Sequence, residues 1–102
     1  MKPNKRTKLT RAGWTVGAMA EFLDLSPEEA AFVELKVALS QSLRQWRTRQ
    51  KLTQGELAQR LRSSQSRVAK MEAADPTVSV DLLVRSLLNL GAKRKDIARA
   101  IA

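Results

Sequence analysis

Neither cysteine nor histidine occurs among the 102 residues of the chain. Disulfide bonds and the common thiol and zinc sites are therefore excluded, and no side chain titrates near neutral pH. Only four residues are aromatic, namely Trp14, Phe22, Phe32 and Trp46, so any core must be mostly aliphatic. Because the usual catalytic side chains are missing, we expect a protein that is not an enzyme and that binds neither a metal nor another cofactor.

Long apolar segments are also missing. No run approaches the roughly 20 apolar residues that a membrane-spanning helix needs, and the amino-terminal segment lacks the apolar centre of a secretory signal. Residues 1–20 are basic and free of acids, as in organelle transit peptides, but Pro3 and Gly13 would interrupt an amphipathic helix. We therefore expect a cytoplasmic protein.

Acidic residues are outnumbered by basic ones. The chain has 10 Asp and Glu against 19 Lys and Arg, which gives a net charge of +9 and a pI near 10.9. This balance favours a polyanionic partner, nucleic acid first and an anionic membrane surface second. The charges are also segregated, because residues 1–13 carry five basic and no acidic residues, whereas residues 14–34 carry five acidic and no basic ones.

The two segments of opposite charge predict separate roles. Residues 1–13 have few apolar side chains and are expected to form a disordered basic arm, which is either a solvated tail or an arm that lies along phosphates or enters the minor groove. Residues 14–34 are expected to form an acidic helical extension. This extension either covers one side of the core or offers an acidic, apolar-faced surface to a basic protein partner.

Capping signals and apolar spacing divide the chain into helices. Ser26 and Pro27 begin a long helix, Thr53 with Glu56 can form a capping box, and Ser63 or Ser64 can cap the helix that follows. After a short helix in the extension, which Thr15 can cap and which ends around Asp24, the signals predict five helices, at residues 27–50, 54–61, 65–73, 80–90 and 95–102. We expect the apolar stripe of the first to contain Phe32, Leu35, Leu39, Leu43 and Trp46, and Ile97 and Ile101 to point inward from the last.

Residues 54–73 form the motif around which the chain is organised. They predict two short helices joined by a tight corner, each with one apolar stripe, and Ala58 falls where the helices would nearly touch. The outward positions at and after the corner carry hydrogen-bonding groups and no acid, and such groups suit base edges and phosphates. These positions are Ser64, Gln65, Ser66, Arg67 and Lys70.

The same residues resemble a known family. Leu52-Thr53-Gln54, Glu56-Leu57-Ala58, Ser64-Gln65-Ser66 and the run from Val68 to Glu72 are similar to the helix-turn-helix domain of Cro/C1-type regulators, the XRE family. The resemblance implies an all-α, five-helix, lambda repressor-like domain, which we assign to residues 35–102. It also implies a transcriptional regulator, usually a repressor, that binds palindromic double-stranded DNA as a homodimer.

The resemblance assigns roles to single residues. It implies that Gln54 touches a phosphate, that Gln65, Ser66 and Lys70 face base edges, and that Ser64 and Arg67 flank them. By the same analogy Arg47 pairs with Glu72. The chain departs from the family at two glycine positions, where it has Arg62 at the corner and Ala74 after the second helix. A residue other than glycine in a left-handed conformation is strained by roughly 1 kcal/mol or more.

The segment ahead of the motif carries a looser resemblance. Residues 14–22 and 25–30 are similar to the leader of HigA-type antitoxins, which implies a partner toxin and repression of the regulator's own operon. Two other classes of protein compete with a DNA-binding regulator. One is a protein-interaction module that neutralises a partner toxin and has incidental DNA affinity, and the other is a basic peripheral membrane protein.

The last two predicted helices carry more apolar residues than a stripe needs. Val80, Leu83 and Leu87 satisfy the core, so we expect a second copy to cover some of the others. The residues beyond the stripe are Leu82, Val84, Leu88, Leu90, Ile97 and Ile101.

Overall fold

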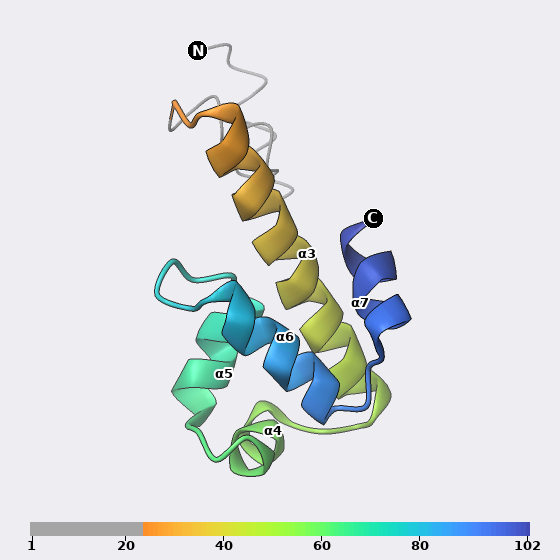
Figure 1. Ribbon diagram of the computed structural model, residues 1–102. Helices are drawn as coiled ribbons and strands as arrows, with labels where there is room; N and C mark the ends of the chain where they lie inside the picture. The colour runs from red at the N-terminus through yellow and green to blue at the C-terminus, as the bar shows by residue number, and fades with distance from the viewer. Residues whose placement is uncertain (1–23) are drawn as a thin grey trace, which may run out of the picture. The chain divides into compact units, whose positions relative to one another are not determined.

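The computed structural model describes residues 24–102, which form five helices and no strand. The helices are α3 (Pro27–Arg49), α4 (Gln54–Arg60), α5 (Gln65–Glu72), α6 (Val80–Asn89) and α7 (Arg94–Ile101), as Figure 1 shows. The all-α, five-helix prediction is therefore confirmed for the described residues. The predicted basic arm and the first ten residues of the predicted acidic extension lie outside them.

Helix α3 begins with the predicted capping box. The backbone N–H of Ser26 donates to Glu29 Oε1 at 3.0 Å, and the backbone N–H of Glu29 donates to Ser26 Oγ at 3.1 Å. Both hydrogen bonds with Ser26 lower the pKa of Glu29, and the bond from the backbone N–H of Ser26 contributes most. The box fixes the start of a helix that crosses from the acidic segment into residues 35–102, which form a compact unit.

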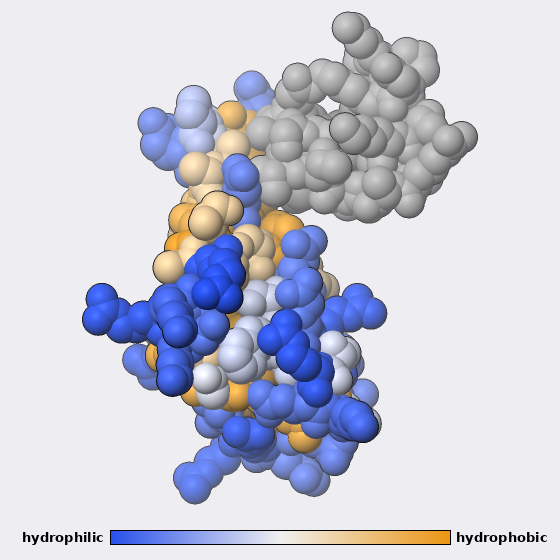
Figure 2. Space-filling model, turned by 90° about the vertical axis from the view of Figure 1, so that its right-hand side faces the viewer, coloured by the Kyte–Doolittle hydropathy of each residue, from blue (hydrophilic) through white to orange (hydrophobic). Residues whose placement is uncertain are grey.

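The apolar stripe of α3 is buried only over its carboxyl-terminal half. Leu39 and Leu43 are buried and Trp46 packs against the core, but Phe32 is 53% exposed and Leu35 is 38% exposed. Figure 2 shows a mostly hydrophilic face of residues 35–102, with apolar colour in small areas between the polar side chains. The unit of residues 35–102 thus uses only part of the stripe for its core.

The core of this unit is aliphatic, as the scarcity of aromatic residues predicts. Each helix from α3 to α6 contributes buried side chains, and α7 adds Ile97 at the edge. The buried apolar residues are Leu39, Leu43, Leu57, Ala58, Val68, Met71, Val78, Leu83, Leu87, Leu90 and Ala92.

Leu90 continues the apolar stripe of α6 and is only 3% exposed, so it belongs to the core. One prediction for the last helices is wrong. Ile101 was expected to point inward, yet it is 40% exposed. It is the last residue of a short helix, one turn beyond the partly buried Ile97, so the core ends before it.

Four helices end in the same hydrogen-bonding pattern. In each, the second residue after the helix has a positive φ, and the next N–H bonds back to a carbonyl five residues earlier. This is the Schellman motif, in which glycine is the preferred left-handed residue. Only α6 uses glycine there; α3, α4 and α5 are followed by Lys51, Arg62 and Ala74, with φ of 59°, 55° and 54°.

These helix ends make a stability prediction. Replacing Arg62 or Ala74 by glycine removes the left-handed strain, so each change should raise the free energy of unfolding by up to about 1 kcal/mol. Gly91→Ala is the matched reverse change, because a Cβ there would meet nothing within 4 Å and only the backbone conformation opposes it. Chemical denaturation should show Gly91→Ala destabilised; equal stability of all four proteins would contradict a strained helix end.

Candidate nucleic-acid interface

Helices α4 and α5 pack against each other around the corner at Arg62. Thr53 and Glu56 close the capping box of α4, and the backbone N–H bond from Thr53 is the main cause of a lowered pKa at Glu56. Ser64, one of the two predicted caps, accepts from the backbone N–H of Arg67 and starts α5. The apolar sides of both helices are buried, so the polar side of α5 is left facing outward.

The end of α5 is held by the predicted ion pair. Arg47 Nε donates to Glu72 Oε2 at 2.5 Å and Nη2 donates to Oε1 at 3.0 Å, while Nη1 donates to the carbonyl of Leu52 at 2.8 Å. The side chains are only 13% and 6% exposed. The hydrogen bond to Glu72 raises the pKa of Arg47. A paired, bidentate charge of this kind resists displacement by water.

Gln54 joins the same cluster, which the sequence reasoning missed. Its Nε2 donates to Glu72 Oε1 at 3.2 Å, so Glu72 contacts α3 and the first residue of α4 from the end of α5. Gln54 is half-buried. No local sequence signal links Gln54 with Glu72, because the residues meet only through the crossing of the two helices.

Four of the six predicted site residues lie around one hollow of about 250 Å³. Ser64, Ser66, Arg67 and Lys70 line it together with Thr77 and Val78 from the segment after α5. Thr77 was not predicted as a site residue. Its backbone N–H and hydroxyl both donate to Asp75 Oδ1, at 2.8 and 2.6 Å, in the turn that the sequence Asp75-Pro76-Thr77 predicts.

Gln65, the fifth predicted residue, lies beside the start of α4. A Cβ built on Gly55 would be 3.9 Å from Gln65 Oε1. The side chain is exposed. The predicted base-facing residues Gln65, Ser66 and Lys70 are therefore all exposed on α5, although only the last two line the hollow.

The acidic residues near α5 all have internal partners. Between residues 50 and 78 the acids are Glu56, Glu72 and Asp75, and each accepts hydrogen bonds described above. The side-chain and then the backbone bond from Thr77 lower the pKa of Asp75, with smaller contributions from nearby Lys70 and Lys36. Arg67 and Lys70 thus lie exposed on a helix whose one acid, Glu72, is paired with Arg47.

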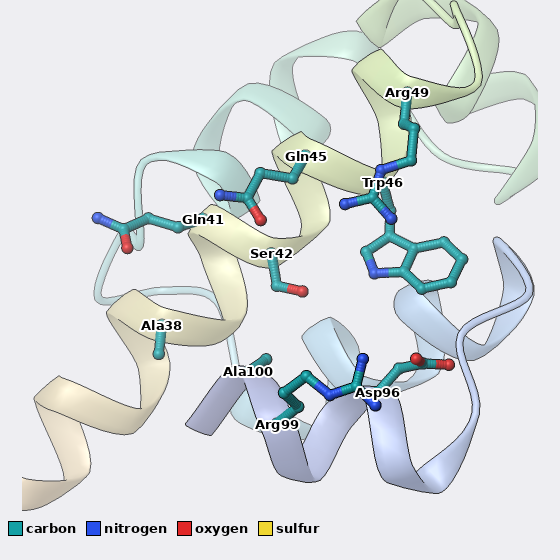
Figure 3. A pocket seen from close by; sticks show the side chains of 9 residues that line it. All are labelled: Ala38, Gln41, Ser42, Gln45, Trp46, Arg49, Asp96, Arg99 and Ala100. Atoms are coloured by element: carbon teal, nitrogen blue, oxygen red, sulfur yellow. The ribbon is translucent and has the colours of Figure 1, made fainter. Parts of the chain in front are cut away.

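A further hollow of about 290 Å³ lies between α3 and α7 (Figure 3). Trp46 faces it, with the guanidinium carbon of Arg49 5.4 Å from its ring centroid. Asp96 and Arg99 approach from α7, so both signs of charge are present. No residue of α5 lines this hollow. It is therefore separate from the candidate interface.

The comparisons with known proteins give one match. A family model described as a helix-turn-helix domain matches residues 21–95. No curated protein and no solved structure matches the chain. Among residues 24–102, no helix combines the length and the apolar character needed to cross a membrane.

The ion pair yields a prediction with an internal control. Glu72→Ala leaves the Arg47 guanidinium largely buried without its carboxylate, so we expect a loss of about 3 kcal/mol in the free energy of unfolding. The pair of Arg85 with Asp81 has side chains 77% and 72% exposed. Asp81→Ala should accordingly change stability by less than about 1 kcal/mol. Urea denaturation measures both, and similar losses in the two variants would show that burial of the pair is not what matters.

Proposed function

The chain belongs to this family of helix-turn-helix domains, and on that premise we propose that it is a sequence-specific DNA-binding transcriptional regulator of the Cro/C1 type. One observation carries the proposal: α5 is fixed on one side by buried Val68, Met71 and Glu72, while its other side exposes Gln65, Ser66 and Lys70. A rigid helix with a polar, acid-free side fits the major groove.

The exposed side chains of α5 have the chemistry of base recognition. Glutamine can bond both major-groove edge atoms of adenine, and lysine can donate to guanine O6 and N7. Serine can serve either base. We therefore propose Gln65, Ser66 and Lys70 as the base-reading residues, with α5 as the recognition helix.

Phosphate contacts would orient the recognition helix on the duplex. We propose Ser64 and Arg67 for contacts at the edge of the base-reading side and Gln54 for a contact at the start of α4. Glu72 takes one N–H of the Gln54 amide, which leaves the second N–H for a phosphate oxygen. In this proposal residues 35–102 are the DNA-binding domain and the basic residues 1–13 add phosphate contacts.

We further propose that the protein acts as a homodimer on an inverted repeat. Leu88 on α6 is 47% exposed and Ile101 on α7 is 40% exposed, which leaves apolar surface for a second copy. Two recognition helices about 34 Å apart would reach successive major grooves. A dimer bound over a promoter would act as a repressor, because it would exclude the polymerase.

A second candidate function rests on the amino-terminal half of α3. Exposed Phe32 and Leu35 lie there beside Glu28, Glu29 and Glu34, in a segment without basic residues. An acidic, apolar surface suits a basic protein partner, as an antitoxin of the HigA type would require. Co-purification of the product of a neighbouring gene, lost on Phe32→Glu, would support this role, whereas a monogenic operon would remove it.

Base reading is tested with an operator selected from random duplexes. Gln65→Ala should weaken binding to that operator by about 1 to 3 kcal/mol and binding to random DNA much less. Gln41→Ala is the matched control, since Gln41 is an exposed glutamine on α3 that lines the hollow facing α7. Fluorescence anisotropy at two salt concentrations separates phosphate attraction from base reading. Equal losses on both DNAs would limit Gln65 to the backbone.

The dimer is tested by charging the exposed leucine of α6. Leu88→Glu should give folded monomers that bind the operator weakly, as measured by sedimentation and anisotropy. Ile97 is unsuitable for this test, because it packs against the core and a glutamate there would unfold the domain. Leu35→Glu, at an exposed leucine of α3, should leave the dimer intact. An unmutated protein that is monomeric at micromolar concentration with full operator affinity would refute the model.

A further inference from the structure

A groove of about 560 Å³ lies between the corner after α4 and the side of α6. No acidic residue lines it, but each surrounding element contributes one arginine, and we call it the arginine groove. The four are Arg60 from α4, Arg62 from the corner, Arg67 from α5 and Arg85 from α6. Leu61, Leu82 and Met71 supply the apolar part of the lining. The proposed base-reading residues Gln65, Ser66 and Lys70 do not line this groove.

The positive charge of the arginine groove is only weakly compensated. Arg60 donates to Asn89 Oδ1 at 3.1 Å, to the Asn89 carbonyl at 3.0 Å and to Gln50 Oε1 at 3.4 Å, so it is held in place by neutral acceptors. Arg85 pairs with Asp81 at 3.1 Å, but both side chains are more than 70% exposed. Because an exposed pair of this kind contributes little free energy, a more highly charged anion can replace Asp81 as the partner of Arg85.

Arg62 lies in this groove in a strained backbone conformation. Its φ of 55° would suit glycine, and a glycine would end α4 equally well. Strain alone does not indicate a function, since Ala74 has almost the same φ of 54° without a cation. At Arg62, however, the strained residue also brings a guanidinium to a groove that already holds three others.

The groove opens away from the base-reading side of α5. At 100° per residue, Arg67 lies about 120° around the helix from the centre of Gln65, Ser66 and Lys70, and Met71 lies about 160° from it. A duplex on the base-reading side would therefore not fill the part of the groove formed by α4 and α6. The arginine groove is a separate surface that meets the interface only at Arg67.

We propose that the arginine groove binds a nucleoside polyphosphate, with its phosphates between the arginines and its base against Leu61 and Leu82. Guanidinium forks match phosphate oxygens in geometry and charge. Four cations that converge on one groove suit a compact polyanion, whereas an acidic strand presents its same-side carboxylates about 7 Å apart along the backbone. The volume is within the range of about 300 to 1,000 Å³ typical of small-molecule sites. This inference does not depend on the DNA-binding role.

Titration calorimetry of the full chain with ATP tests the proposal. Arg62→Gly should weaken ATP binding about tenfold, which corresponds to the loss of one charge-assisted hydrogen bond. The same variant should melt at an equal or higher temperature, so unfolding cannot explain the loss. Ala74→Gly relieves the same kind of strain without removing a charge and should leave ATP binding unchanged.

Two further arms separate this site from general attraction to a basic protein. Arg94→Ala removes one exposed charge outside the groove and should weaken ATP binding by less than about twofold in 0.15 M salt. A loss equal to that of Arg62→Gly would overturn the site. Inorganic triphosphate should bind several-fold more weakly than ATP; equal affinity would overturn the contact with the base. Binding of duplex DNA alone at this groove, with no ATP binding, would overturn the proposal entirely.

Discussion

The carboxylate of Glu72 is the point on which the position of helix α5 depends. Helix α5 has only eight residues, too few for a helix to persist in water without tertiary contacts. Val68 and Met71 fix which side faces the core, but an apolar contact permits sliding. The bidentate bond from Arg47 and the amide of Gln54 attach the end of α5 to α3 and α4. The base contacts proposed for α5 would require that precision, because each hydrogen bond has a defined length and direction.

The helix ends show a second constraint, because the fold requires a backbone conformation there that residues other than glycine disfavour. Short connections after α3, α4 and α5 require a left-handed residue, and the chain places Lys51, Arg62 and Ala74 there. The left-handed conformation persists because the N–H group that follows it donates to a helix carbonyl that would otherwise lack a partner. The packing of the helices also fixes where the next helix must begin, so the connection cannot take a less strained path. The backbone is thus strained at the residues where one helix ends and the chain turns toward the next.

Local signals explain why so much of the fold was predictable. The caps at Ser26, Thr53 and Ser64 act within four residues, so they can be identified without knowing the tertiary structure. Burial at the domain edge depends on contacts across helices instead. For that reason the stripes of α4 and α5 were predicted correctly, while the inward position expected for Ile101 was not. The contact of Gln54 with Glu72 and the position of Thr77 beside Lys70 are likewise products of packing.

The arrangement of the charges, more than their sum, separates DNA from a membrane as the partner of this basic chain. A membrane-surface helix needs a large apolar side that is free to enter lipid. In α4 and α5 every large apolar side chain is buried or packed against the core, and the exposed large ones lie on α3, α6 and α7. The cations of α5 therefore stand on a helix with no apolar side left for lipid. Because Glu72, the one acid of α5, is paired with Arg47, the exposed side of this helix presents cations together with serine and glutamine, the combination that a duplex groove accepts.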